Sequence, residues 1–559
     1  MNTLKDYVNF KLTHADKVAE AEGYPLKMEN CKKYKKMKQL MLYGNTVQDG
    51  TPTPDTPVDV VSVGEPTVNL ATAYEVCKGF DYYTEVIEDG RNCVRYLDAN
   101  TTKANPFGFK ENTQYTVSFD CKLEKGQWGN DETTPTSIMM VFHYTDGTMG
   151  AVSTKDGIAM SVRGVWQSKT MTSQAGKTVL GIGTRSYQYQ NYNYIDVNTF
   201  QVQEGTATPY EPYGKYKISV VQKGVNLLKD AREIYNGNGA EDSNIANMYE
   251  EVIEDGRECI RFTTSNSTRY RKIKFKENTQ YTFSFDSKGV KRSEDVTGYD
   301  VCLAIFYTDG STSSVTSNDY GKFDTWIHRK FISLKNKTID YIGLYVREYR
   351  IYCYIDINTF QIQEGTTATP YELYVEPVAT NIFLNEPLRK LGNYADYIDF
   401  KNDKVVRNID KQLVDTSIPQ SHCNVNIDTE DVLSIYRGEG FIGNTYLGNH
   451  QIFSSFFPYY HWNNAGNKVN VVWCFGVSAG FKINTDLIDD YDYSWTKQQK
   501  ITAFLKWAES IGLDWYLARK TPREEPLNIN LPKLTAKTTI IEVDTSLVPS
   551  NTYGKYIKK

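Results

Sequence analysis

Apolar and polar residues alternate with a period of two through much of the middle of the chain. Residues 115–120 read Tyr-Thr-Val-Ser-Phe-Asp, and residues 281–286 read Tyr-Thr-Phe-Ser-Phe-Asp. A half-buried strand produces this alternation because successive side chains point to opposite faces of a sheet. Asp146 and Gly147 form a hairpin-turn signal between two extended segments. These patterns, without helical stretches between them, predict antiparallel β-sandwiches.

Four sequence blocks occur twice in the same order, which indicates that one unit was duplicated. The separation between the copies is 166 residues for the first block (251 minus 85) and 160 residues for the last (354 minus 194). The second copy has therefore lost residues between matching blocks, and loops tolerate such losses. Each copy has the length of one domain. The paired blocks are residues 85–91 and 251–257, 111–116 and 277–282, 144–147 and 307–310, and 194–200 and 354–360.

The two ends of the chain follow other patterns. Near the N-terminus, apolar residues at helical spacing predict a helix that packs on a copy of itself. They are Leu4, Val8, Leu12, Ala15 and Ala19. Alternating Thr and Pro within residues 45–57 predict an extended linker. Near the C-terminus, Thr496 and Gln499 fit a capping box and Gly512 fits a helix C-cap. The apolar face between them consists of Ile501, Phe504, Leu505, Ala508 and Ile511.

We therefore expect a mainly β protein with tandem antiparallel, jelly-roll-like β-sandwich domains, an N-terminal helical segment and one helix in the C-terminal domain. The predicted domains are an attachment and trimerisation region with its linker (1–68), a first sandwich (69–213), a second sandwich (214–374) and a β-rich distal domain (375–559).

Composition narrows the classes of function. The net charge of -5 argues against nucleic acid as the main partner. The nine Cys include no Cys-x-x-Cys pair, which argues against a disulfide scaffold and a zinc ribbon. The longest apolar runs, such as residues 471–475, are too short to span a membrane, and the first residues lack the order of a signal peptide. The 42 Tyr favour strands and binding surfaces.

A Tyr-rich segment in each repeat is a candidate carbohydrate-binding strand. Sugars present C–H patches and hydroxyls, so they bind flat aromatic faces beside planar hydrogen-bonding groups. Alternation places Arg185, Tyr187 and Tyr189 on one face of a strand, and an offset of 162 (347 minus 185) matches Arg185 with Arg347. The alternative is that these aromatics cover a sheet or pack between domains. The candidates in the repeats are Trp166, Arg185, Tyr187, Tyr189, Trp326, Arg347 and Tyr349.

The C-terminal domain contains a second aromatic candidate. Aromatic side chains there lie beside Asn and His between Gly and Pro, a pattern typical of an exposed loop, and exposed loop aromatics usually bind a ligand. The alternative is a loop that folds over its own core. The candidate ligand-binding residues are Tyr459, Tyr460, His461, Trp462 and Asn463.

Catalytic chemistry finds little support in the sequence. We expect no Gly-x-Ser-x-Gly nucleophile elbow, and no His-Glu-x-x-His motif or P-loop occurs. His422 and Cys423 are adjacent, so on a strand their side chains would point to opposite faces and could not cooperate. Four acidic residues before the predicted helix lack the spacing of a calcium loop and indicate a solvated turn. They are Asp486, Asp489, Asp490 and Asp492. We expect no enzymatic activity, no catalytic residue and no cofactor.

Several segments resemble tail or baseplate proteins of phages and prophages of Gram-positive, clostridia-like bacteria. They are residues 43–54, 203–210, 388–392, 397–400 and 538–544. The order of blocks in each repeat also resembles carbohydrate-binding jelly rolls, in which Asp196 and Asp356 would lie where structural calcium can be held. Residues 415–514 follow the shared pattern least, so individual specificity is expected there.

The resemblance implies a receptor-binding, tail-fibre-like protein that attaches a phage or a phage-like bacteriocin to its host. The implied partners are further copies of the chain in a homotrimer, other tail or baseplate proteins through the N-terminal region, and host cell-wall or surface polysaccharide, without nucleic acid or membrane insertion. The implied location is the virion tail or baseplate, assembled in the host cytoplasm and acting outside the target cell. The alternatives are a purely architectural baseplate subunit and a polysaccharide depolymerase.

Overall fold

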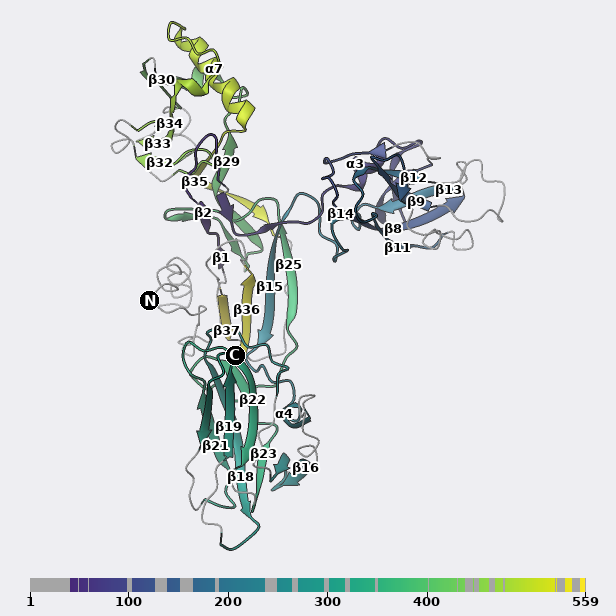
Figure 1. The fold of residues 1–559 in the computed structure, drawn as a ribbon, viewed down its shortest axis with the longest axis vertical. Coiled ribbons are helices and arrows are strands. Elements are labelled where there is room, and N and C mark those ends of the chain that lie inside the picture. The colour runs from purple at the N-terminus through teal and green to yellow at the C-terminus, as the bar shows by residue number, and fades with distance from the viewer. Residues whose placement is uncertain are drawn as a thin grey trace. The chain divides into compact units, whose positions relative to one another are not determined.

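The computed structural model describes most of the chain after residue 40, and its elements are shown in Figure 1. The N-terminal helix expected over Leu4 to Ala19 lies outside the described residues. The described ranges are 41–48, 50–58, 60–97, 103–125, 138–150, 164–185, 191–236, 249–263, 270–295, 301–316, 322–346, 350–400, 402–429, 431–437, 446, 452–461, 468–475, 478–527, 529, 538–544 and 553–557.

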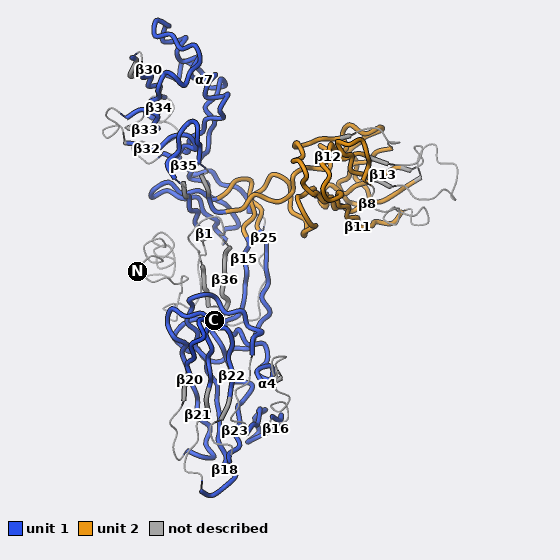
Figure 2. Tube along the Cα trace, viewed as in Figure 1, with its two compact units in different colours: residues 1–63, 219–381, 388–559 blue, residues 64–218, 382–387 orange. Residues whose placement is uncertain are grey.

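The chain divides into two compact units, coloured in Figure 2. Unit 2 consists of residues 64–218 and 382–387 and contains the first repeat. Unit 1 consists of residues 1–63, 219–381 and 388–559 and contains the second repeat and the C-terminal part of the chain. Within the described residues, no helix is both long enough and apolar enough to cross a membrane.

The first repeat folds as an antiparallel β-sandwich. Its elements are α3 (Ala73–Cys77), β5 (Thr84–Glu88), β6 (Arg91–Tyr96), β7 (Lys103–Ala104), β8 (Tyr115–Lys125), β9 (Ile138–Tyr144), β10 (Met149–Gly150), β11 (Gln167–Thr172), β12 (Val179–Arg185), β13 (Asn191–Asp196) and β14 (Gln201–Glu204). One sheet has the order β11-β8-β13-β6-β5, with β14 also paired to β8. The other sheet has the order β10-β9-β12-β7.

The two-residue period of β8 explains how these sheets pack. Val117 and Leu123 are among its odd-numbered residues, which lie in the core together with Phe142 of β9. The even-numbered residues, such as Asp120, face away from that core. The predicted hairpin turn is also confirmed, because β9 pairs with β10 across Gly147, which has a φ of 81°.

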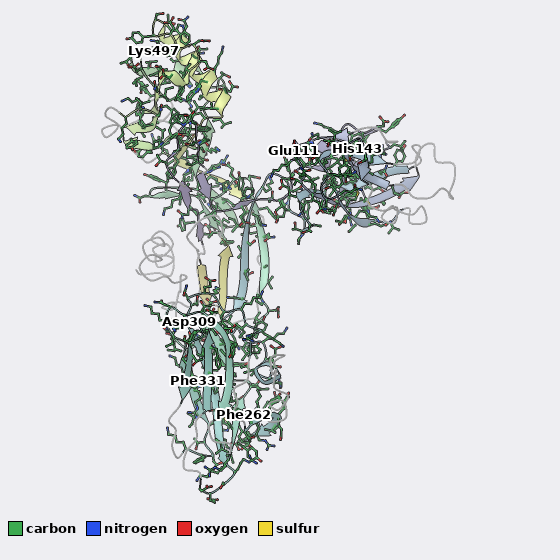
Figure 3. The ribbon with its side chains drawn as sticks, viewed as in Figure 1. Glu111, His143, Phe262, Asp309, Phe331 and Lys497 are labelled. Atoms are coloured by element: carbon green, nitrogen blue, oxygen red, sulfur yellow. The ribbon has the colours of Figure 1, made fainter. Side chains whose placement is uncertain are left out.

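The second repeat folds as a sandwich with the same strand order. Its elements are α4 (Glu233–Asn236), β16 (Tyr249–Glu254), β17 (Arg257–Phe262), β18 (Tyr281–Lys291), β19 (Val301–Tyr307), β20 (Thr312–Thr316), β21 (Ile327–Ile332), β22 (Ile339–Val346), β23 (Ile351–Asp356) and β24 (Gln361–Glu364). Its sheets have the orders β16-β17-β23-β18-β21 and β20-β19-β22. Phe262 and Phe331, labelled in Figure 3, lie in the core between them. The tandem β-sandwich prediction is therefore confirmed.

A buried Asn at the start of each repeat joins its first segment to its last strand. The Nδ2 of Asn69 donates to the carbonyl of Phe200 at 2.9 Å, and its Oδ1 accepts from the backbone of Val202 at 3.0 Å. Asn226 repeats the second bond with Ile362 at 3.2 Å. Asn-Leu begins both copies in the sequence, at residues 69–70 and 226–227, and its Asn forms this closure in each sandwich.

The C-terminal part combines two sheets with a long helix. Its elements are β1 (Met41–Tyr43), β26 (Lys390–Leu391), β27 (Tyr394–Ala395), β28 (Tyr397–Asp399), β29 (Lys404–Leu413), η4 (Gln420–His422), β30 (Cys423–Asp428), β31 (Val432–Arg437), β32 (Tyr459–His461), β33 (Val471–Phe475), β34 (Ser478–Asn484), η5 (Thr485–Leu487), α7 (Lys497–Ile511) and β35 (Asp514–Pro526). The sheets have the orders β1-β28-β29-β35 and β30-β31-β34-β33-β32, and β26 pairs with β27. The strand of residues 41–43 thus completes a sheet of the C-terminal part.

Helix α7 matches its prediction from the sequence. The Thr496 side chain accepts from the Gln499 backbone while the Gln499 side chain accepts from the Thr496 backbone, which is a capping box. Gly512 ends the helix in the left-handed conformation at a φ of 68°. The buried face contains Phe504 and Leu505, which pack in the core of the C-terminal part.

Among the described residues, seven further strands belong to two other sheets. They are β2 (Thr46–Gln48), β3 (Val60–Ser62), β4 (Glu65–Pro66), β15 (Tyr216–Gly224), β25 (Val378–Leu384), β36 (Thr538–Asp544) and β37 (Tyr553–Ile557). β2 pairs with β3, so part of the Thr/Pro segment forms the loop of a hairpin. In unit 1, β15 pairs with β36 and β36 pairs with β37.

A buried ion pair holds the strands of the C-terminal part in register. The side chains of Asp396 and Arg407 are both 0% exposed, and Asp396 Oδ2 lies 3.6 Å from Arg407 Nη1. Asp396 also accepts from the backbone of Arg389 at 3.0 Å, of Asn408 at 2.7 Å and of Ile409 at 3.0 Å. Burial raises the pKa of Asp396 to about 6, although Arg407 acts to lower it.

Replacing Asp396 with Asn should change how stability depends on pH. An unfolded Asp has a pKa of about 4, so between about pH 4 and pH 6 the folded chain binds more protons and its stability falls as the pH rises. We expect the free energy of unfolding of the natural chain, relative to Asp396→Asn, to fall by about 3 kcal/mol from pH 4 to pH 7 in urea titrations. Parallel pH profiles for the two chains would contradict this, and Asp324→Asn in an exposed turn is the control.

Candidate functional site

Trp166 lies over a row of charged side chains on the outer face of the larger sheet of the first sandwich. Its Nε1 donates to Asp89 Oδ2 at 2.9 Å, and the Cζ of Arg91 lies 4.5 Å from the ring centroid. The Nη1 of Arg91 donates to Asp120 Oδ2 at 2.9 Å and to Asp196 Oδ2 at 3.1 Å. The indole is therefore held by both its N–H and one ring face.

The second sandwich repeats this arrangement. The Nε1 of Trp326 donates to Asp255 Oδ2 at 3.0 Å, and the Cζ of Arg257 lies 4.6 Å from the ring centroid. Arg257 Nη1 bonds Asp286 and Asp356, each at 3.0 Å. Asp196 and Asp356, which the sequence suggested as positions for structural calcium, are therefore each paired with an arginine. Among the described residues, no group of three His, Cys, Asp or Glu could hold a metal ion.

These outer-face clusters stabilise charge on the sheet. Hydrogen bonds from Lys122 and Trp166 hold the pKa of Asp89 below its ordinary value. Hydrogen bonds from Lys288 and Trp326 do the same for Asp255. The geometry accounts for both Trp residues as parts of the sheet surface, while their contact with sugar stays a prediction.

The strand register changes how the Tyr-rich segments correspond. Gly181 pairs with His143 in the first sandwich, and Tyr341 pairs with Phe306 in the second. Up to Gly183, β12 and β22 therefore correspond at an offset of 160 (341 minus 181), the same as the offset from Trp166 to Trp326. The register shifts between Gly183 and Arg185, and Arg347 lies outside the described residues, so the match of Arg185 with Arg347 stays a prediction. Tyr341 stacks on Phe306 with ring centroids 4.2 Å apart. This ring covers a sheet face.

Several predicted ligand-binding residues cannot be placed from the structure. Arg185 ends β12 and His461 ends β32, and only their backbones are described. The residues outside the described ranges are Tyr187, Tyr189, Arg347, Tyr349, Trp462 and Asn463.

The aromatic segment of the C-terminal part is a strand where it is described. Phe457 is 0% exposed and lies in the core. Tyr459 and Tyr460 are half-buried in β32, which pairs in parallel with β33. The Nζ of Lys468 lies 4.4 Å from the Tyr460 ring centroid. The exposed-loop prediction is therefore wrong for residues 457–460, because Phe457 anchors them to the core.

Two sequence features that suggest a nucleophile lack the structure that a nucleophile needs. Burial raises the pKa of the Cys423 thiol, which disfavours the reactive thiolate. Residues 476–480 read Gly-Val-Ser-Ala-Gly, a match to Gly-x-Ser-x-Gly that was not among the sequence-based candidates. β33 and β34 pair antiparallel through Phe475 and Ser478. Ser478 therefore begins the second strand of a hairpin, whereas the nucleophile elbow joins a strand to a helix.

A cleft of about 610 Å³ lies along the outer side of α7, the helix that begins at Lys497 in Figure 3. The loop after η5 forms one wall and the helix forms the other. Two half-buried indoles contribute to the lining, Trp495 just before the N-cap and Trp507 near the end of the helix. Trp507 packs on Phe504 with ring centroids 5.8 Å apart, so its position is fixed by the core.

Polar side chains lie between the two indoles of this α7 cleft. Asp489, Gln498 and Lys506 line it and are exposed. Within the described part of the chain, the Asp489 carboxylate and the Lys506 ammonium have no hydrogen-bond partner. Thr502 also lines the cleft and accepts a hydrogen bond from Gln420 Nε2 at 2.9 Å. The cleft thus offers ring faces together with a carboxylate, an amide and an ammonium.

The α7 cleft was missed from the sequence, although a signal for it was present. The helical pattern identified Phe504 and Leu505 as the buried stripe, and Trp507 follows on the flank of that stripe. A large aromatic on the edge of an amphipathic face can belong to the core and to the surface at once. The wall formed by Asp489 depends on how the loop folds back on the helix, which helical periodicity does not report.

Comparisons with known proteins give no family. No family model matches the chain, and no curated protein matches it. Solved structures that align with it include the N-terminal CBM22 tandem domain of Xyn10C from Paenibacillus barcinonensis, with 12% identity over 54% of this chain and 99% of that chain at a TM-score of 0.24. The tripod from the baseplate of bacteriophage Tuc2009 aligns with 14% identity over 40% of this chain and 90% of that chain at a TM-score of 0.18.

A third alignment is with the tandem CBM51 modules of Sp3GH98, a family 98 glycoside hydrolase from Streptococcus pneumoniae. It has 12% identity over 58% of this chain and 100% of that chain at a TM-score of 0.15. At such identities and TM-scores these similarities carry no argument about function, which therefore rests on the chemistry of the site and the motifs of the sequence.

Replacing Lys288 with Met should destabilise the second sandwich in a pH-dependent way. Lys288 bonds Glu254 at 2.6 Å and Asp255 at 2.8 Å, and losing these bonds should cost about 1 kcal/mol at pH 7. Because the folded pKa of Asp255 lies below its unfolded value, its contribution is present at neutral pH and is lost as the pH falls through the folded pKa. Urea titrations should show that the difference in the free energy of unfolding between the natural chain and Lys288→Met becomes smaller in acid. A constant difference, or an equal loss in Lys330→Met, would refute the role of this ion pair.

Proposed function

We propose that this chain is a tail or baseplate component of a phage or phage-like particle and that it adheres to host cell-surface glycan. The observation that carries the proposal is the α7 cleft, which has Trp495 and Trp507 among its lining residues. Indole faces bind the C–H patches of pyranose rings, and neighbouring polar groups bind their hydroxyls. Asp489 and Gln498 are the polar side chains to which we assign hydroxyl recognition.

The position of the cleft in the chain supports this assignment. All residues that line it fall within residues 415–514, the region in which the sequence follows the shared tail-protein pattern least. A receptor-binding surface is where such divergence is expected, whereas the shared motifs around Asp396 serve register and burial. Within the C-terminal part, the residues that we assign to binding are therefore different from those that maintain the fold.

We propose adhesion without catalysis. Hydrolysis of a glycosidic bond by the common mechanism requires two carboxyl groups on either side of the bond. Asp489 is the one carboxylate among the described residues that line the α7 cleft. A single carboxylate is suited to accepting hydroxyl hydrogen bonds, and release of reducing sugar from host walls would refute this part of the proposal.

The proposal includes several copies of the chain in each particle. A shallow cleft with a few hydrogen bonds gives weak affinity at one site, and multiple linked sites raise the overall affinity without new contacts. We assign the N-terminal region to self-association in a homotrimer and to attachment in the particle, and the two sandwiches to a spacer between attachment and receptor.

Loss of the indole before α7 should weaken adhesion to host walls. We expect Trp495→Ala and Gln498→Ala in the full-length chain to weaken binding to purified host cell walls by about tenfold or more, because each removes a contact to the sugar. Binding is measured by pulldown over a range of wall concentrations, and circular dichroism checks that each variant is folded.

Tyr460→Ala separates this site from the aromatic segment at β32. Adhesion that survives Tyr460→Ala and fails in Trp495→Ala assigns the receptor site to the α7 cleft. Adhesion lost only in Tyr460→Ala would move the site to β32. A folded natural chain that binds no host wall would favour the purely architectural subunit instead.

A further inference from the structure

The second sandwich contains a cleft whose walls are rich in lysine. It has a volume of about 490 Å³ and lies entirely within residues 223–377. One wall is the end of β15 with the segment that follows it, and another is the segment from Tyr270 to Lys276. Glu364, at the end of β24, lies among the lining residues.

Positive charge exceeds negative charge in this lysine cleft. Among the described residues that line it, five lysines face two glutamates, Glu233 and Glu364. The lysines are Lys223, Lys229, Lys272, Lys274 and Lys276. The chain as a whole has a net charge of -5, so the cleft is a local reversal of sign. A concave surface of one sign raises the local concentration of ligands of the opposite sign.

At the buried end of the cleft, one carboxylate pairs with two ammonium groups. Glu364 Oε1 lies 3.2 Å from the Nζ of Lys223 and 3.1 Å from the Nζ of Lys276. Burial acts to raise the pKa of Glu364, but the two ammonium groups hold this pKa below its ordinary value. Lys272 and Lys274 are both exposed. The Nζ of Lys272 lies 3.4 Å from Glu233 Oε1, while the ammonium group of Lys274 has no ion-pair partner among the described residues.

The duplication supplies an internal comparison for this cleft. Asn226 corresponds to Asn69 and Tyr281 to Tyr115, which sets offsets of 157 and 166 for the two walls. Lys276 has a counterpart in Lys110, which pairs with Glu204 at 2.7 Å. The other four lysines have none, because Lys223, Lys229, Lys272 and Lys274 stand where the first sandwich has Pro66, Thr72, Pro106 and Gly108.

This difference does not arise from packing. The cores of the two sandwiches use matching positions, such as Phe283 and Val117 on the long strands β18 and β8. The exposed Lys272 and Lys274 are not among the residues of the core. Lys272 pairs with Glu233 at 3.4 Å and Lys229 pairs with Glu376 at 3.5 Å, both on exposed or half-buried side chains where such pairs contribute little to stability. The second copy thus has four lysines that the first copy lacks, and with Lys276 they outnumber the glutamates Glu233, Glu364 and Glu376 that pair with them. This excess of positive charge in one copy is the observation that points to an anionic ligand.

We propose that the lysine cleft of the second sandwich binds the anionic groups, phosphate or carboxylate, of a charged polysaccharide. Ammonium groups bind both kinds of anion through charge-assisted hydrogen bonds. The half-buried ring of Tyr374 lines the same cleft and offers a face to the sugar or polyol that carries the charge, whereas Tyr270 and Tyr281 are buried in the core behind it. The site extends the proposed adhesive function and uses residues distinct from those of the α7 cleft.

The test is binding of the full-length chain to immobilised poly(glycerol phosphate), polygalacturonate and neutral dextran. We expect binding to at least one anionic polymer, weakened by salt, and little binding to dextran. Lys272→Glu combined with Lys274→Glu should weaken that binding by about tenfold or more, while Lys330→Glu combined with Lys335→Glu, a charge-matched control on the same sandwich, should change it by less than about twofold. Tighter binding to poly(glycerol phosphate) identifies phosphate as the preferred group, and tighter binding to polygalacturonate identifies carboxylate.

Three results would overturn the proposal. They are absence of binding to both anionic polymers, equal losses in the two double variants, and equal or tighter binding of single-stranded DNA through the same lysines. The result is separable from the adhesive function, because Trp495→Ala should leave polymer binding intact. If Trp495→Ala binds host walls as the natural chain does while the lysine variant loses the polymers, the α7 proposal fails and the lysine cleft stands.

Discussion

The two-residue period of the long strands is the constraint on which this structure depends. It assigns alternate residues of β8 and β18 to a core and to an outer face, and both sandwiches follow the same assignment. The core positions are apolar in both copies, and the outer positions Asp120 and Asp286 belong to matching clusters with an Arg and a Trp from neighbouring segments of the sheet. Because these two sets of residues maintain the sandwich, the loops and edges around them are free to differ.

That freedom explains where the two sandwiches diverge. The Asn closure, the hairpin turns and the outer-face clusters recur with nearly the same distances in both copies. The lysine cleft lies where β15 leads into the second sandwich, and of these recurring features only the closure residue Asn226 is among its lining residues. In the C-terminal part α7 divides its residues in the same way, with Phe504 in the core and Lys506 on the cleft side.

Local patterns in the sequence predict the local structure well. The alternation around Phe119, the turn at Gly147 and the cap at Thr496 each report an interaction between near neighbours, and each is found. The duplication also carries a fold prediction from one repeat to the other. The prediction of an exposed aromatic loop was wrong for residues 457–460 because the burial of Phe457 depends on Phe481 and Trp507, which are far away in the sequence.

The functional surfaces depend on contacts that no local pattern reports. The lysine cleft joins Lys223 to Lys276 through Glu364, residues separated by 53 and 88 positions in the chain (276 minus 223, and 364 minus 276). The α7 cleft needs the loop at Asp489 to fold beside Trp507. The sequence could identify residues 415–514 as the region of individual specificity, and only the fold shows which of its side chains meet.

The most direct test of the central claim is a crystal structure of the chain with oligosaccharides released from the host walls that it binds. We predict a sugar ring against the indole of Trp495 or Trp507, with its hydroxyls bonded to Asp489 or Gln498. A sugar bound at Trp166, Trp326 or Tyr460 with the α7 cleft empty would contradict it.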